Sequence, residues 1–255
     1  MELSMPGLTA VERATMELTG KVALVTGAAR RIGRAIAIRL AEEGMNIAVH
    51  WNTSARDANR TVAECQQRGV RAVPIQGDLT DPDCAATIMS QAATLGPVQV
   101  LINNASRFIP NRLDEIDREQ IEQDHLIHVV SPALLSREFS RQLPSGAEGR
   151  IVQLLDWRAS IADPRHFSYG LAKAGMLHLM KLLAAELAPN TTVNAISPGS
   201  ILPPSSIPDE EGDPHDSTEE TDAMRQLTDS LIYLVKDADN TTGRIIPVNG
   251  GKTLS

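Results

Sequence analysis

The sequence is poor in cysteine and in aromatic residues. Its 255 residues include two cysteines, Cys65 and Cys84, whose spacing does not match a metal-binding pair. We therefore expect both to be reduced thiols packed inside a protein of the cytoplasm. Aromatic residues make up 3% of the chain, so Phe108 and Tyr169 are notable where they fall within motifs.

Basic residues are too few to balance the acidic ones. Lysine and arginine number 24 against 32 aspartates and glutamates, which gives a formal net charge of -8. This excess argues against a nucleic-acid partner and against an anionic-membrane surface. Long apolar runs are also missing, because no stretch approaches the length of a membrane span and the start of the chain lacks the hydrophobic core of a secretion signal. The composition predicts a soluble, cytoplasmic protein with no membrane partner.

Alternating strand and helix patterns run along most of the chain and predict a parallel sheet. The expected fold class is α/β, a single-domain Rossmann-type doubly wound parallel sheet of about seven strands with helices on both faces. We expect this domain to span residues 18–255, after an N-terminal extension of residues 1–17 in which Met16 is a candidate natural start. The expected strands are 21–26, 46–50, 71–76, 98–102, 150–155, 191–196 and 244–249.

One compositional break interrupts the alternation between Pro198 and Asp222. The segment holds five prolines and a cluster of acidic residues, so it cannot bury much surface. We expect a flexible, acidic and proline-rich substrate loop near residues 199–222. His215 lies among these acids, but such clusters are usually solvated loops, and no metal site is predicted.

A glycine turn follows the first expected strand. The apolar run Lys21–Thr26 leads into Gly27, Gly33 and a helical pattern that reaches Glu43. Strand, turn and helix in this order point backbone N–H groups and the positive end of a helix dipole at a phosphate. The usual dinucleotide fingerprint has a further glycine inside the turn, where this chain has Arg31 or its neighbour. The turn alone is therefore a weak sign of a dinucleotide site.

Three polar residues further along have the spacing of a hydride-transfer site. Asp156 precedes Tyr169 by thirteen residues, and Lys173 follows that tyrosine by four. On a helix, a spacing of four places both side chains on one face, where the lysine charge can lower the pKa of the phenol. Such a phenol can donate and accept protons near neutral pH. The alternative is an exposed tyrosine beside an unrelated lysine, because such pairs also occur by chance.

Four motifs, in this order, resemble the signature of the short-chain dehydrogenase/reductase family. They are Thr26-Gly27-x5-Gly33, Asn103-Asn104-Ala105-Ser106, Tyr169-x3-Lys173 and Pro198-Gly199, and the resemblance covers residues 18–255. The turn TGAARRIG, Phe108 shortly after the NNAS run, and Asp156 where most members have serine are similar to the pteridine reductases, which include the dihydromonapterin reductases. The resemblance implies NADPH-dependent reduction of a dihydropteridine to a tetrahydropteridine, with dihydrofolate as a further candidate substrate.

The residues that follow the second expected strand favour NADPH as the cofactor. NAD sites usually place an acid about twenty positions after the glycine turn, where it binds the ribose hydroxyls. Here no acid follows the strand before Asp57, so a 2′-phosphate would not be repelled. Arg30 and Arg31 can neutralise that phosphate, or else they form a surface face at a helix N-terminus. The expected cofactor-binding residues, several of them implied by the resemblance, are Gly27, Arg30, Arg31, Ile32, Gly33, Asn52, Thr53, Ser54, Asp78, Leu79, Asn104, Ala105, Ser106, Tyr169, Lys173, Pro198, Gly199, Ser200 and Ile201.

The resemblance also implies roles in the site. Tyr169 supplies a proton to a pterin ring nitrogen, while Lys173 holds the nicotinamide ribose and lowers the pKa of the phenol. Asp156 hydrogen-bonds Tyr169 or the pterin, or else makes a local turn hydrogen bond. Phe108 stacks on the pterin, with core packing as the alternative. The expected catalytic residues are Asp156, Tyr169 and Lys173, and the expected substrate-binding residues are Arg31, Ser106, Phe108, Asp156 and Tyr169.

Three further expectations come from the resemblance. His128 takes the place of the family's catalytic asparagine, where it either preserves a proton relay to the lysine or caps a helix kink. A homotetramer is implied, built through the long helices around residues 116–141 and 165–187. Asp78 and Leu79 resemble the family's adenine-contacting pair, although Asp78 can equally cap a helix.

Two other functions remain open at this point. An NADPH-dependent ketone or 3-oxoacyl reductase of the same family would keep Tyr169 and Lys173 but would favour serine at the position of Asp156. A noncatalytic, NADPH-sensing Rossmann protein belongs to a different class and would have little reason to keep the tyrosine with the lysine.

Overall fold

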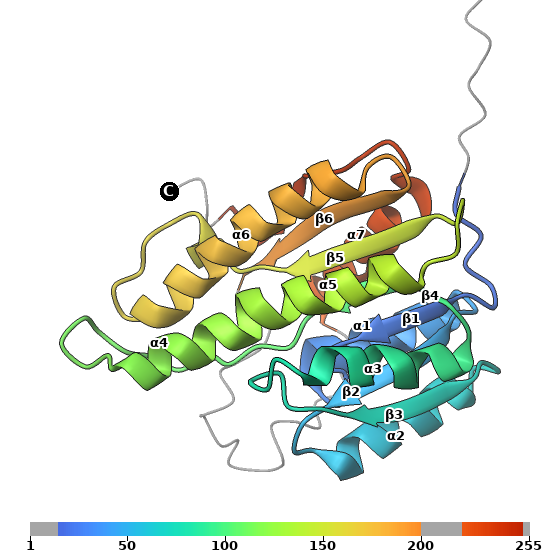
Figure 1. Cartoon of the computed structure of the whole chain (residues 1–255), viewed down its shortest axis with the longest axis horizontal. Helices are drawn as coiled ribbons and strands as arrows, with labels where there is room; N and C mark the ends of the chain where they lie inside the picture. Colours follow the sequence, from blue (N-terminus) through green and yellow to red (C-terminus); the bar gives the residue numbers. More distant parts are fainter. Residues whose placement is uncertain (1–14, 200–220, 252–255) are drawn as a thin grey trace, which may run out of the picture.

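A computed structural model describes residues 15–199 and 221–251 of the chain (Figure 1). The predicted substrate loop lies almost wholly outside the described residues, and with it Ser200, Ile201 and His215. The predicted extension also lies outside them, except for its last residues.

The structure confirms the predicted fold class, a single α/β domain built on a seven-stranded sheet. All strand pairs are parallel, and the strand order is β3-β2-β1-β4-β5-β6-β7. The strands are β1 (Val22–Val25), β2 (Asn46–Trp51), β3 (Ala72–Gln76), β4 (Val98–Asn103), β5 (Gly149–Leu154), β6 (Thr191–Pro198) and β7 (Ile245–Val248).

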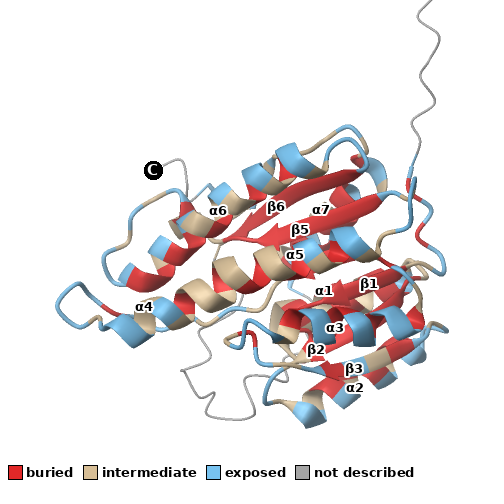
Figure 2. Cartoon of the chain, viewed as in Figure 1, coloured by how far each residue is buried: buried red, intermediate tan, exposed pale blue. Residues whose placement is uncertain are grey.

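Helices cover both faces of this sheet, and the buried strands lie between them (Figures 1 and 2). One face carries α1 (Arg31–Glu42), α2 (Ala55–Gln66) and α7 (Asp222–Ile232). The other carries α3 (Cys84–Ala92), α5 (Ser131–Gln142) and α6 (Phe167–Leu187). Because both faces are covered, the inner strands are continuous apolar runs rather than alternating ones, as in β1, where all four residues are buried.

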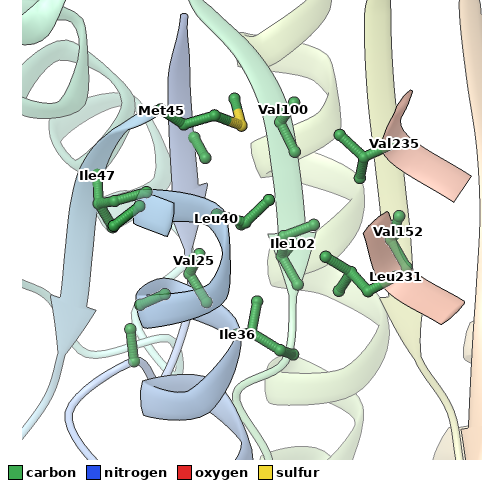
Figure 3. Close-up of a cluster of buried hydrophobic side chains, with 14 of the residues drawn as sticks. Val25, Ile36, Leu40, Met45, Ile47, Val100, Ile102, Val152, Leu231 and Val235 are labelled. Atoms are coloured by element: carbon green, nitrogen blue, oxygen red, sulfur yellow. The ribbon is translucent and has the colours of Figure 1, made fainter. Parts of the chain in front are cut away.

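Figure 3 shows how one core layer is filled. Ile36 and Leu40 of α1 pack against Val25 and Ile102 of the sheet, and Leu231 of α7 belongs to the same cluster. The two α1 residues are four positions apart and so lie on one face of the helix. Burial of each such side chain stabilises the fold by roughly 1.5–3 kcal/mol.

The packed part of the chain begins inside the predicted extension. Met16 and Leu18 are 3% and 2% exposed and join the same core cluster. The backbone N–H of Met16 donates to the carbonyl of Lys236 at 2.8 Å, in a π-helical turn at Tyr233–Asp237 that continues α7. Met16 is thereby tied to the π-helical turn that continues α7.

The long helix predicted around residues 116–141 is observed as two α-helices joined by a wider turn. Asp117 caps α4 (Arg118–His125) by accepting from the N–H of Gln120 at 2.8 Å. A π-helical turn at Leu126–Val130, which holds His128, then leads into α5. Such turns often mark functional sites.

Shorter elements complete the described chain, namely 3-10 turns at Ala93–Leu95 and Trp157–Ala159. Both cysteines are free thiols, and burial raises the pKa of Cys65 to about 12 and that of Cys84 to about 11. Neither is therefore a reactive thiolate near neutral pH. None of the described helices combines the length and apolar character needed to cross a membrane.

Candidate active site

A cleft of about 1760 Å³ lies at the carboxyl ends of the strands, around the point where the strand order reverses between β1 and β4. Open parallel sheets bind ligands at this position. The cleft is lined by every predicted site residue that the structure describes. These are Gly27, Arg30, Arg31, Ile32, Gly33, Asn52, Thr53, Ser54, Asp78, Leu79, Asn104, Ala105, Ser106, Phe108, Asp156, Tyr169, Lys173, Pro198 and Gly199.

The glycine turn packs closely against its own helix. Gly27 has a φ of 64°, in the left-handed region that favours glycine. A Cβ atom at Gly33 would lie 2.1 Å from the Gly27 carbonyl oxygen, so a larger residue would displace the turn. The chain therefore keeps backbone atoms where a ligand can approach them closely.

Arg31 occupies the place of the missing glycine and adopts a glycine-like backbone, with a φ of 53°. This conformation costs an L-residue roughly 1–2 kcal/mol. Burial, and then the charge of Arg30, lower the pKa of the Arg31 guanidinium. Arg30 itself lies 3.5 Å from Asp57, measured between Nε and Oδ2. The first acid after β2 thus contacts a basic residue of the turn.

His50, near the end of β2, holds the glycine turn through a hydrogen bond to its backbone. No role for this residue was predicted from the sequence. Its Nδ1 accepts from the N–H of Gly27 at 3.1 Å. Its Nε2 lies 3.1 Å from the carbonyl of Gly77, which can only accept, so Nε2 carries the proton. Burial lowers the pKa of His50 to about 4, and the imidazole is neutral.

Thr26 joins the ends of β1 and β4. Its hydroxyl donates to the carbonyl of Ile102 at 3.2 Å and accepts from the N–H groups of Asn104 and Ala105 at 2.9 and 3.0 Å. The Asn104 side chain returns a hydrogen bond to the Thr26 carbonyl at 2.8 Å. The first and second resembling motifs are therefore one hydrogen-bonded unit at the floor of the cleft.

Tyr169 and Lys173 lie one turn apart on α6 and are both buried, with exposures of 4% and 2%. The ammonium of Lys173 lies 5.6 Å from the centre of the Tyr169 ring and donates to the carbonyl of Leu154 at 2.7 Å. Burial lowers the pKa of Lys173 to about 8, and the carboxylate of Asp156 opposes that shift. The pair thus faces the cleft on one side of the helix, as the spacing predicted.

The pKa of Tyr169 moves in the direction opposite to the sequence prediction. Burial raises it well above the usual value, and the charge of Asp156 raises it further. Ser106 and the charge of Arg158 lower the pKa, but their effect is smaller than that of burial and Asp156. Tyr169 is therefore a neutral phenol, a proton donor rather than a base.

Asp156 makes the local turn contact, which is one of the two alternatives, and also acts on Tyr169. It caps the turn Trp157–Ala159 by accepting from the N–H of Arg158 at 2.8 Å, and it raises the pKa of the Tyr169 phenol. The Arg158 guanidinium lies 3.3 Å from the same carboxylate. That guanidinium also donates to buried Asp163 at 2.9 Å.

Phe108 is 44% exposed, so core packing, the alternative interpretation, is wrong. Its ring stacks on His166 with centroids 4.3 Å apart and meets Tyr169 edge-on at 4.9 Å. The Arg158 guanidinium lies 5.1 Å from the Phe108 ring centre. A partly exposed aromatic ring therefore lies beside the phenol.

His128 is buried behind Ser106. Its Nε2 lies 3.0 Å from the Ser106 hydroxyl, and its Nδ1 lies 2.8 Å from the carbonyl of Asp124. Its ring meets Tyr169 edge-on at 5.3 Å. Burial, and then the charge of Lys173, hold the pKa of His128 well below its usual value.

A second group of residues, not predicted from the sequence, also shapes this site. Arg158, Asp163 and His166 lie on the turn and loop between β5 and α6, where no periodic pattern exists to place them. Hydrogen bonds from Arg165, Arg158 and His166 hold the pKa of Asp163 far below its ordinary range, so it is a fixed anion. One signal was available, namely a basic residue two positions after Asp156.

Comparison with known proteins agrees with this geometry. Residues 21–212 match the family described as short chain dehydrogenase. The chain is 35% identical to the 3-oxoacyl-(acyl-carrier-protein) reductase FabG of Staphylococcus aureus, covering 92% of this chain and 99% of the relative. It is 29% identical to an NADPH-dependent aldehyde reductase-like protein, chloroplastic, of Arabidopsis thaliana, covering 95% and 98%. Among solved structures, FolM alternative dihydrofolate reductase 1 of Brucella canis, complexed with NADP, gives a TM-score of 0.83 at 29% identity, covering 94% of this chain and 96% of that one.

Proposed function

The chain belongs to the short-chain dehydrogenase family, and we propose that it is an NADPH-dependent reductase of a dihydropterin, with dihydrofolate as a second substrate. The observation that carries this proposal is that a carboxylate, Asp156, lines the same cleft as the buried phenol of Tyr169 and raises the pKa of that phenol. A carboxylate only accepts hydrogen bonds, so it suits a substrate that offers ring N–H groups. The NADP-bound FolM structure supports the same assignment.

The chain's residues fit a dinucleotide. The glycine turn keeps space that a Cβ at Gly33 would fill, and α1 points its N-terminus at that space. Arg30 and Arg31 line the cleft beside Thr53, where they can bind a 2′-phosphate. Arg30 also offsets Asp57, an acid that would otherwise oppose the phosphate. We infer a preference for NADPH over NADH, which their kcat/KM ratio measures.

Bound NADPH supplies the hydride that forms a new C–H bond at a pterin C=N group. The phenol of Tyr169 supplies the proton that forms the N–H bond, and its raised pKa keeps that proton in place until it is needed. Lys173 places a positive charge beside the phenolate that remains. Asp156 accepts from the pterin or from the phenol, and the partly exposed ring of Phe108 contacts the flat substrate.

A carbonyl reductase of the same family is the second candidate. The 35% identity to FabG and the similarity to the Arabidopsis aldehyde reductase-like protein favour it. The site itself argues the other way, because a carbonyl oxygen that accepts from the phenol of Tyr169 would also face the carboxylate of Asp156, which supplies no donor. A noncatalytic NADPH sensor would not need a buried phenol next to a buried ammonium.

The proposal extends to assembly and location. We propose a homotetramer in the cytoplasm, formed through α4, α5 and α6. Leu171 and Leu182 of α6 are 49% and 56% exposed, and leucines on a long helix at these exposures are suited to a contact between subunits. Light scattering on the purified full chain measures the mass directly.

The decisive experiment for the function is a comparison of kcat/KM across substrate classes with NADPH. Dihydrobiopterin, dihydromonapterin and dihydrofolate are measured beside a panel of ketones and a 3-oxoacyl thioester. At least one pterin is expected to exceed every carbonyl by ~10-fold or more. A carbonyl that exceeds every pterin would establish the second candidate, and NADPH binding without any turnover would establish the sensor.

A further inference from the structure

We propose that His128 is a specificity-determining residue, which sets the hydrogen-bond polarity of Ser106 and so makes the cleft favour a substrate that brings an N–H donor. This inference rests on the proposed pterin reduction. It depends on which nitrogen of one buried imidazole carries the proton.

The surroundings of His128 fix its tautomer. Its Nδ1 lies 2.8 Å from the backbone carbonyl of Asp124, which can only accept, so Nδ1 carries the proton. The ring is 0% exposed and the ammonium of Lys173 disfavours a second positive charge, so the imidazole is neutral. Nε2 is therefore an acceptor, and the Ser106 hydroxyl, 3.0 Å away, donates to it.

The network that holds Asp124 supports this arrangement. Its buried carboxylate accepts from the hydroxyl of Ser168 at 2.5 Å and lies 3.4 Å from the guanidinium of Arg107. The side chain of Asn111 donates to the same serine oxygen at 2.6 Å. These contacts hold the end of α4, and with it the carbonyl that fixes the imidazole.

The consequence is that Ser106 has no proton left for the cleft. A serine hydroxyl carries one proton, and here it is donated to Nε2 of His128. The oxygen of Ser106 therefore offers lone pairs to a ligand. The carboxylate of Asp156, which lines the same cleft, also offers acceptors alone.

A ligand can hydrogen-bond these two groups only by donating. Ser106 and Asp156 line the cleft, so a ring N–H can reach them, whereas a carbonyl oxygen would bring a further acceptor. With the opposite tautomer, Nε2–H would donate to Ser106, whose own proton would then be free for a carbonyl oxygen, and the preference would vanish. The buried carbonyl of Asp124 thus acts on substrate choice through His128 and Ser106.

The first test needs no substrate and does not depend on the proposed function. In protein labelled with ¹⁵N-histidine, the resonances of His128 are identified among the six histidines by their loss in His128→Asn. A neutral ring with its proton on Nδ1 at neutral pH is the expected result. A proton on Nε2, or a charged ring, would overturn the inference, whatever the enzyme reduces.

The second test measures substrate discrimination. In His128→Asn, the shorter amide can still donate to Asp124 but no longer accepts from Ser106, whose hydroxyl is then free to donate. The ratio of kcat/KM for a dihydropterin to that for a ketone is expected to fall by about 10-fold, as for one hydrogen bond. The same substitution in a Ser106→Ala background should leave that ratio unchanged. His178→Asn, at an exposed position of α6, is the matched control.

The outcomes separate the two proposals. A proportional loss for both substrates, or an equal effect in the Ser106→Ala background, would show that His128 has a structural role and would overturn the inference. If the wild-type protein reduces ketones but no pterin, the proposed function fails, and the inference then requires kcat/KM for the ketone to rise in His128→Asn. Unchanged NADPH affinity and thermal stability show that the variant is folded.

Discussion

Arg158 and Asp156 form a short pair at the edge of the cleft, with Nη1 of the guanidinium 3.3 Å from the carboxylate. The arginine is held in this place by buried Asp163, which accepts from its Nε at 2.9 Å, and by the ring of Trp157, whose centre lies 4.3 Å away. These contacts hold the Asp156 carboxylate in the cleft that Tyr169 also lines. Arg158 thus holds the carboxylate of Asp156 in place.

Removal of that support is expected to impair turnover while leaving the protein folded. Arg158→Gln should lower kcat/KM for the substrate by about 10-fold, because Asp156 loses a charged hydrogen bond that orients it. Arg165→Gln is the matched control, since Arg165 pairs with the same Asp163 but its side chain is 64% exposed. Steady-state kinetics of the two variants decide the matter, and equal effects would show that the loop as a whole, rather than Arg158, is responsible.

Loss of the phenol should abolish the chemistry and spare the cofactor. Tyr169→Phe is expected to lower kcat at least ~100-fold, the contribution of a general acid, with NADPH affinity nearly unchanged. Tyr233→Phe, the other tyrosine of the chain and 48% exposed, should behave as wild type. Turnover and fluorescence titration with NADPH provide the two readouts. Wild-type turnover in Tyr169→Phe would remove this residue from the mechanism.

Lys173 should make stability depend on pH in the alkaline range. Burial lowers its pKa from 10.5 to about 8, so between these values the unfolded chain binds more protons than the folded one. The free energy of unfolding contributed by this residue therefore rises with pH across that window, by at most about 1.4 kcal/mol per pH unit. Urea unfolding of wild type and Lys173→Met at about pH 8 and about pH 10 isolates the residue. A difference between the two proteins that stays constant with pH would contradict the lowered pKa.

Two helical glycines should respond to alanine in opposite ways. At Gly33 the new Cβ would lie 2.1 Å from a carbonyl oxygen, so Gly33→Ala is expected to lose about 2 kcal/mol or more and to weaken NADPH binding. At Gly170 the nearest atom is 4.0 Å away, so Gly170→Ala should gain about 0.5–1 kcal/mol from helix propensity. Thermal unfolding and NADPH titration test both variants. Tight binding in Gly33→Ala would show that the turn can move.

The fold could be predicted from the sequence because the strands of a sheet covered on both faces are apolar along most of their length. Each strand is a short run of apolar and β-branched residues, and each of the seven predicted ranges overlaps an observed strand, as 191–196 does with β6. The lining of the cleft followed for a related reason. The motifs come directly after strands, and the carboxyl ends of parallel strands meet at one edge.

The electrostatics of the site could not be predicted in the same way. Spacing placed Lys173 beside Tyr169 correctly, but the pKa of the phenol depends on burial and on the contact with Asp156, which no local pattern reveals. His50 and Arg158 act through contacts between distant elements or along an irregular loop. Contacts of this kind form only when the chain is folded, so a sequence pattern does not predict them.

The most direct test of the central claim, that the carboxylate beside the phenol selects the substrate class, is one ratio of kcat/KM in one variant. Asp156→Ser exchanges an acceptor for a group that can donate to a carbonyl oxygen. The ratio for a dihydropterin against a ketone is predicted to fall by at least ~100-fold, with the ketone gaining in absolute terms. A ratio equal to that of the wild-type protein would contradict the account.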